Sequence, residues 1–269
     1  MMDTNKVSHK KSQLREQIWD TMDPFVKGPK PIQGRIPNFQ GSRAAANNLV
    51  ETVEFQRAQV VKVHPSLNAI PLRESVLRSG KVLIVPPLPG HDFLYFRVNP
   101  EDIRNKRFNW AAQKRGFNRI GVPLQLKDIP KIDLFVIAAT VVSFEGCRAG
   151  KGKGYGEVEW GIVSELGVVD SSTTVATIVH DLQVVDSKQF PSELMETHDL
   201  PVDLIATPSR IIRCQNNSCD EIADKQESKA STCQLKKPNG IMWDKIDNNM
   251  MKDIGALKAL KLQLDMKEL

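Results

Sequence analysis

A glycine-rich, basic segment near the middle of the chain constrains the fold more than any other feature. It combines one arginine, two lysines and glycines at every second position: Arg148, Gly150, Lys151, Gly152, Lys153 and Gly154. An apolar run at 132–142 precedes it, and 158–166 has the composition of a helix. Glycine lets backbone N–H groups approach oxygen atoms that a side chain would block, and a helix N-terminus adds positive potential. The order strand, glycine-rich turn, helix therefore predicts a phosphate-binding loop.

Two common phosphate-binding motifs do not describe this segment. It lacks the Gly-Lys-Ser/Thr ending of a P-loop. It also does not open the first strand–helix unit of the chain, as a dinucleotide-binding fingerprint usually does. On glycines and lysines alone, a flexible basic loop without a ligand is an equally good interpretation.

Three segments, in the same order along the chain, resemble one enzyme family. The sequence Arg-Ala-Gly-Lys-Gly-Lys-Gly-Tyr at 148–155, followed by the acid Glu157, resembles the phosphate loop of the 5-formyltetrahydrofolate cyclo-ligase family. The sequence Lys-Ser-Gln-Leu-Arg at 11–15 resembles the family's Lys-x-x-Leu-Arg, and 198–208 resembles its last core strand with the acidic turn before it. The resemblance extends from about residue 10 to residue 212.

This resemblance implies an ATP-dependent reaction on a reduced folate. In the family, ATP phosphorylates the formyl oxygen of 5-formyltetrahydrofolate, N10 attacks, and phosphate leaves as 5,10-methenyltetrahydrofolate forms. The resemblance implies ATP binding by Lys11, Arg15, Arg148, Gly150, Lys151, Gly152, Lys153, Gly154 and Tyr155. It implies that Glu157 and Asp199 hold Mg²⁺, which needs one or two carboxylates. Glu157 has one methylene more than the family's aspartate. No catalytic side chain is assigned.

The chain departs from the family pattern on the folate side. The family's substrate-contacting glutamate corresponds to Ser66, Leu67 and Asn68, none of which is acidic. The second aromatic residue of the loop is Gly156. A second hypothesis is therefore a catalytically silent relative that acts as a nucleotide-regulated binding protein, RNA-associated as in longer relatives. His180, His198 and Asp186 have no matching nucleophile and are interpreted as turn residues.

Short, continuous, β-rich apolar runs alternate with helical segments along the chain. The strands are expected at 60–63, 82–85, 134–139, 175–179 and 204–206, and the helices at 10–22, 43–57, 72–77 and 103–114. Continuous apolar strands separated by helices indicate a parallel sheet that is buried on both faces. The sequence predicts an α/β domain at 10–212, a three-layer, doubly wound fold with a mainly parallel sheet. Its ligand should lie beyond the carboxyl ends of the strands.

The two ends of the chain have a different composition. Residues 1–9 are expected to be disordered, and 213–236 is expected to be a flexible polar insert. The segment 237–269 is expected to dock on the domain and to end in an amphipathic helix. The cysteines at 147, 214, 219 and 233 lack a fourth zinc ligand nearby, so free thiols are expected.

Composition limits the classes of partner. The net charge of +5 suits a phosphorylated ligand, but the aromatic–basic strand of an RNA-recognition motif is not found, so no specific nucleic acid is predicted. No window approaches the roughly 18 apolar residues that a membrane span needs. A cytoplasmic location is expected.

Overall fold

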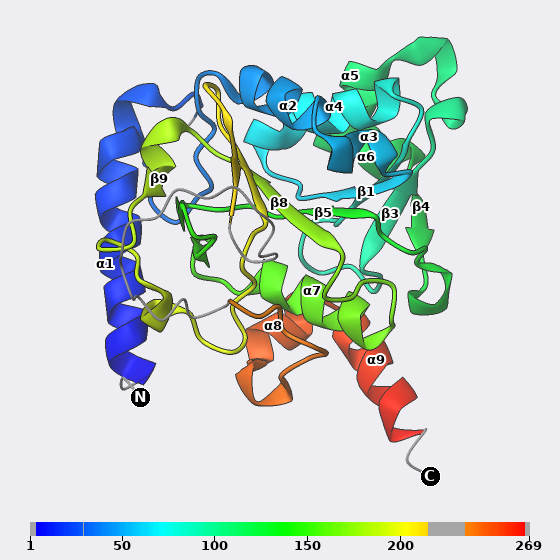
Figure 1. Ribbon diagram of the computed structural model, residues 1–269. Coiled ribbons are helices and arrows are strands. Elements are labelled where there is room, and N and C mark those ends of the chain that lie inside the picture. Colours follow the sequence, from blue (N-terminus) through cyan, green and yellow to red (C-terminus); the bar gives the residue numbers. More distant parts are fainter. Residues whose placement is uncertain (1–3, 29, 215–234, 267–269) are drawn as a thin grey trace, which may run out of the picture.

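A twisted, mostly parallel sheet forms the centre of the molecule (Figure 1). The computed structural model describes residues 4–28, 30–214 and 235–266. Over these residues the main sheet has eight strands in the order β11-β10-β8-β5-β1-β2-β3-β4. Their bounds are β1 Val60–Val63, β2 Val82–Val85, β3 Tyr95–Val98, β4 Val122–Leu124, β5 Leu134–Val136, β8 Thr174–Ile178, β10 Leu204–Ala206 and β11 Ile211–Arg213. The strands from β10 to β2 pair in parallel, whereas β3, β4 and β11 are antiparallel additions at the edges.

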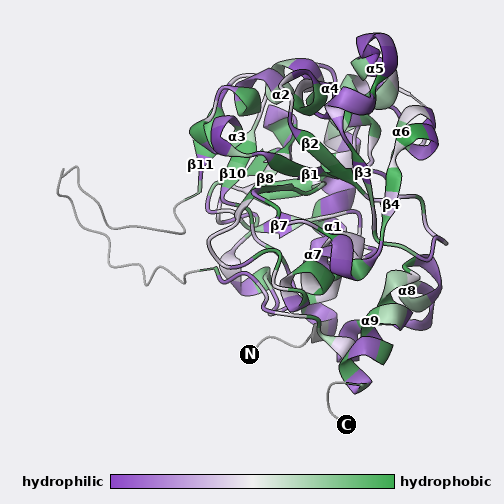
Figure 2. Ribbon diagram, turned by 90° about the vertical axis from the view of Figure 1, so that its right-hand side faces the viewer, coloured by the Kyte–Doolittle hydropathy of each residue, from purple (hydrophilic) through white to green (hydrophobic). Residues whose placement is uncertain are grey.

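Helices cover both faces of the sheet, which confirms the three-layer α/β fold. One face carries α2 Ser42–Val50, α3 Val53–Arg57, α4 Ile70–Arg78, α5 Phe108–Ala111 and α6 Lys114–Ile120, and the other carries α7 Tyr155–Glu165, α8 Asn248–Asp253 and α9 Ala256–Asp265 (Figure 1). Alternate residues of β5 belong to different cores: Leu134 and Val136 face one layer, and Phe135 faces the other. Continuous apolar strands are needed because both faces are buried. Figure 2 shows these apolar strands between the two layers.

The helix α1, Thr4–Met22, lies beside the domain and packs on a second, small sheet. That sheet has the order β7-β6-β9, with β6 at Val141–Ser143, β7 at Arg148–Ala149 and β9 at Val184–Val185. The helix begins at Thr4 rather than at residue 10. The prediction that residues 1–9 are disordered is therefore wrong from Thr4 onward. Val7, Leu14 and Ile18 are buried on one face of α1, and Val7 explains the earlier start.

Two of the expected helices are interrupted. The segment 43–57 divides at Thr52, which is extended and whose hydroxyl accepts the backbone N–H of Phe55 as the N-cap of α3. The segment 103–114 is broken by positive φ at Asn105 and Lys106 and by extended backbone at Gln113. Its aromatic residues Phe108 and Trp110 pack against the core.

The C-terminal segment lies against α7. The indole Nε1 of Trp160 donates to the carbonyl oxygen of Pro238 (2.8 Å), and Leu257 and Leu260 of α9 are buried. Within the expected insert 213–236, Arg213 belongs to β11 and Cys214 is buried, while 215–234, which include Cys219 and Cys233, lie outside the described residues. Across the described ranges, no helix is both long and apolar enough to cross a bilayer.

Candidate functional site

The glycine-rich loop joins β7 to α7 and turns sharply at two glycines. Gly152 has φ +92° and Gly154 has φ +65°, a backbone region that side-chain-bearing residues rarely adopt. Helix α7 begins at the next residue, Tyr155, so its free N–H groups face the loop. The hairpin β6–β7 that leads into the loop was not predicted, because the only strand expected in this part of the chain was 134–139. The loop thus has the backbone form of an anion-binding site.

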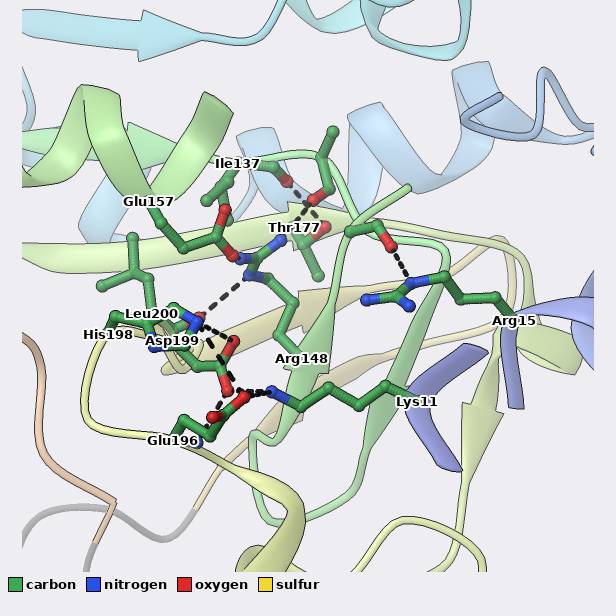
Figure 3. A network of polar contacts seen from close by, with 12 residues as sticks. Lys11, Arg15, Ile137, Arg148, Glu157, Thr177, Glu196, His198, Asp199 and Leu200 are labelled. Atoms are coloured by element: carbon green, nitrogen blue, oxygen red, sulfur yellow. Dashed lines mark hydrogen bonds and ion pairs between the residues drawn. The ribbon is translucent and has the colours of Figure 1, made fainter. Parts of the chain in front are cut away.

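Arg148 holds this loop in place from inside the protein. Its side chain is 1% exposed. Its Nε donates to the carbonyl oxygen of Leu200 (2.9 Å), Nη1 donates to that of Ala138 (2.9 Å), and Nη2 pairs with Glu157 (Figure 3). Burial lowers the pKa of Arg148 to about 10, so the guanidinium stays charged at neutral pH. With all three nitrogens engaged, Arg148 is placed to order the loop, and its expected contact with phosphate stays a prediction.

Two cations of α1 reach the loop from the side. The Nε of Arg15 donates to the carbonyl oxygen of Gly150 (2.7 Å). The Nζ of Lys11 is 3.2 Å from Glu196 Oε2 and also pairs with Asp199 (Figure 3). Burial lowers the pKa of Arg15, opposed by the charge of Asp199. The expected pair Lys11–Arg15 therefore lies next to the loop, although more than a hundred residues of sequence separate this pair from the loop.

A cavity of about 280 Å³ opens between α1, the loop and the C-terminal segment. Among the expected site residues, it is lined by Lys11, Arg15, Gly150, Gly152, Lys153, Gly154, Glu157 and Asp199. We call it the loop cavity. Arg148, Lys151 and Tyr155 do not line it. The structure thus brings most of the expected phosphate site together around one space.

A second cavity, of about 200 Å³, lies on the other side of the loop. It opens where β1, β2 and β5 end, and its walls are apolar and rich in proline: Pro65, Pro86, Pro87, Pro89, Phe93 and Ile137. Lys151 and Tyr155 line this strand-end cavity. Four residues line both spaces: Gly150, Lys153, Gly154 and Glu157. The loop is therefore a shared wall between two cavities.

The strand-end cavity has charged and polar groups that the sequence analysis missed. Lys62 of β1 is 1% exposed, lies 2.5 Å from Glu159 of α7, and sits 3.9 Å from the ring centre of Phe135. Burial lowers the pKa of Lys62, which the charge of Glu159 opposes. A lysine inside the apolar run Val-Val-Lys-Val was the available signal, because buried lysines need a partner.

His64 follows β1 and lines the same cavity. It is 4% exposed, and the part of the chain that the structure describes gives neither ring nitrogen a hydrogen-bond partner. Burial, with the charge of Arg73, lowers the pKa of His64 well below its usual value, so the ring is neutral at neutral pH. A neutral imidazole offers one donor and one acceptor.

Carboxylates gather on the turn before β10. One ligand atom each from Glu196, His198 and Asp199 lies within 4.8 Å of the others. Asp199 Oδ2 also accepts the backbone N–H of Glu196 (2.7 Å). Carboxylate oxygens suit Mg²⁺, so Glu196 and Asp199 fit this ion, and Lys11 now neutralises them. Glu157 is less available because it pairs with Arg148.

Comparison with known proteins shows the family of the chain. The family model of the 5-formyltetrahydrofolate cyclo-ligase family matches residues 7–208, which is more than half of the chain. The chain belongs to this family. It is 37% identical over 267 residues to the human methenyltetrahydrofolate synthase domain-containing protein, with 97% of the chain and 63% of the human protein covered. The zebrafish (Danio rerio) protein of the same description is 32% identical, with 92% and 60% covered. The chain thus spans less than two thirds of these relatives.

A solved structure shows the same fold. The NMR structure of Aquifex aeolicus 5,10-methenyltetrahydrofolate synthetase superimposes with a TM-score of 0.50 at 21% identity, covering 79% of this chain and 96% of the Aquifex chain. The family match ends at residue 208, so β11 and the C-terminal segment lie beyond it. The residues that line the loop cavity from this segment are therefore additions to the family domain.

Proposed function

We propose that the chain binds ATP in the loop cavity and uses it in a cyclo-ligase reaction on a reduced folate in the strand-end cavity. The observation that carries this proposal is the shared loop wall of Gly150, Lys153, Gly154 and Glu157. A phosphoryl group must pass from ATP to the folate. Because the same loop residues border both cavities, the two ligands are held next to each other. Family membership supports the same chemistry.

The loop cavity supplies the charge that a triphosphate needs. Lys11, Arg15 and Lys153 are cationic, and the left-handed glycines together with the start of α7 present backbone N–H groups. Lys11 can turn from the carboxylates to a phosphate when Mg²⁺ is held by Glu196 and Asp199. Bound Mg²⁺ neutralises phosphate charge and orients the triphosphate. The protein's contribution is positioning, as is usual for phosphoryl transfer.

The strand-end cavity fits the ring end of a folate. The formyl oxygen attacks the γ-phosphorus and ADP leaves; N10 then attacks the formyl carbon and loses its proton, and inorganic phosphate leaves as the methenyl bridge closes. The cavity's apolar walls exclude water from this activated carbon. Glu159 provides an acid on α7 where 66–68 provide none. At Gly156 a Cβ would lie 2.7 Å from Ile137 Cδ1, so a side chain at this position would require Ile137 to shift.

Formation of 5,10-methenyltetrahydrofolate tests the reaction directly. Purified protein with 5-formyltetrahydrofolate, ATP and Mg²⁺ is expected to produce the near-ultraviolet absorbance of the methenyl product, and omission of ATP is expected to abolish it. Glu159→Gln should reduce turnover while ATP affinity stays unchanged, since Glu159 does not line the loop cavity.

One observation favours a second function. Glu159 is already paired with Lys62, so the acid of the strand-end cavity is neutralised before any substrate enters. A protein that binds ATP normally but gives no methenyl product would be a nucleotide-regulated binding protein. Calorimetric titration with ATP, run beside the absorbance assay, separates the two functions. Absence of both ATP binding and turnover would contradict both.

A further inference from the structure

One side of the loop cavity comes from a segment outside the family domain. Pro238, Ile241, Met242, Ile246 and Met250 line this cavity, although the family match ends at residue 208. All five side chains are apolar. The opposite side carries Lys11, Arg15 and Lys153. The cavity therefore has one half that holds these cations together with the carboxylates of Glu157, Glu196 and Asp199, which we call the cationic half, and a largely apolar half that also includes Lys245.

The segment is fastened to α7 along its length. In addition to the bond from Trp160 to Pro238, the backbone N–H of Gly240 donates to Ser164 Oγ (3.0 Å), and that of Ile241 donates to Glu165 Oε2 (3.3 Å). A glycine on the helix favours this close approach, since a Cβ at Gly161 would lie 3.2 Å from the backbone of Gly240 and Ile241, a tight contact. Because α7 starts at the loop, these contacts fix the apolar wall relative to the phosphate site.

The apolar wall also touches the loop itself. A Cβ added at Gly154 would lie 2.7 Å from Met250 Cε, so this methionine packs directly over the glycine that precedes α7. Asp253, three residues later, accepts a hydrogen bond from the hydroxyl of Tyr155, the first residue of α7. The wall and the phosphate-binding backbone are thus in contact, with no gap between the two halves of the cavity.

A ligand for such a cavity carries several negative charges at one end and an apolar, flat group at the other. Inorganic phosphates satisfy only the cationic half. Methionine side chains adapt to the faces of aromatic rings, and their sulfur contacts with rings are favourable. We propose that residues 238–250 form the subsite for the base of a nucleoside triphosphate. This inference rests on the proposed ATP function and assigns the base to a segment that the family domain lacks.

If residues 238–250 hold the base, contacts between the base and this segment should contribute to the affinity for ATP. Wild-type protein with Mg²⁺ is expected to bind ATP at least about tenfold more tightly than inorganic triphosphate, measured by calorimetry. Met242→Ala removes apolar contact of about 1 kcal/mol and should weaken ATP about fivefold, while triphosphate affinity stays within about twofold. Ile246→Ala should behave in the same way. Met266→Ala, at an exposed position on the end of α9, is the matched control and should change neither affinity.

The outcomes separate this inference from the function on which it rests. Equal wild-type affinity for ATP and triphosphate, or an equal loss of both in Met242→Ala, would show that the base lies elsewhere while the phosphate loop stands. If wild-type protein binds neither ligand, the phosphate site is wrong and the base subsite falls with it. Selective loss of ATP affinity in both lining variants, with Met266→Ala unchanged, supports the subsite.

Discussion

Arg148→Met is expected to lower the free energy of unfolding by about 3–5 kcal/mol, because it removes one partner of a buried ion pair. The substitution leaves Glu157 without its cation and leaves the carbonyl oxygens of Leu200 and Ala138 without donors. These two carbonyls belong to the turn before β10 and to the end of β5, so the loop loses its attachment to both. Urea or guanidinium unfolding, followed by circular dichroism, measures the change.

Two further variants separate the ion pair from the rest of the contact. The double variant Arg148→Met/Glu157→Gln has no unpaired charge and should regain part of the free energy of unfolding. It should not regain the part lost through the two unsatisfied carbonyl oxygens, about 1–3 kcal/mol each. Arg119→Met, at an exposed position on α6, should stay within about 0.5 kcal/mol of wild type. If Arg148→Met kept wild-type stability and lost only ATP affinity, Arg148 would be a phosphate ligand, as its sequence pattern first indicated.

The parts of the fold that were predictable are those decided by local pattern. Strands β1, β2 and β10 have the bounds expected from sequence, because short, β-branched, mostly apolar runs favour strands buried on both faces. Strands β4 and β11 were missed, since edge strands are short and carry polar or exposed residues, and β4 contains Pro123. Strand β3, which lies between β2 and β4 and is largely buried, was also missed. The helix expected at 103–114 is interrupted by positive φ at Asn105 and Lys106 and by extended backbone at Gln113, which leaves α5 at Phe108–Ala111.

The same division holds for the candidate site. Glycine spacing located the loop, and the resemblance located Lys11, Arg15 and Asp199, which the structure places around one cavity. Spacing does not say which way a side chain points, so it could not show that Arg148 faces inward. Docking of the segment 237–269 on the domain was expected, but its place beside the loop cavity was not. Its place depends on backbone contacts with α7, for which the sequence has no local pattern.

The loop offers two lysines, and they are expected to differ in their effect on ATP. Lys153→Ala should weaken ATP binding about tenfold to hundredfold, because a charge-assisted hydrogen bond to phosphate is worth about 1.5–3 kcal/mol. Lys153 lines the loop cavity, whereas Lys151 lines only the strand-end cavity. Lys151→Ala should therefore change the ATP affinity less than about threefold. Calorimetry with ATP and Mg²⁺ compares the two variants, which have the same composition, charge and loop.

The comparison works because both lysines are exposed and both border the strand-end cavity, whereas Lys153 borders the loop cavity as well. Partial burial and the charge of Lys153 lower the pKa of Lys151, so Lys153→Ala raises the pKa of Lys151, and this change at Lys151 does not weaken anion binding. If Lys151 instead supplies the phosphate contact, the order of the two variants reverses. Equal losses would mean that the loop acts through its overall charge, and such losses would shrink with added salt, which screens exposed charges. A selective, salt-resistant loss in Lys153→Ala is the result that places the triphosphate on the α1 side of the glycine loop.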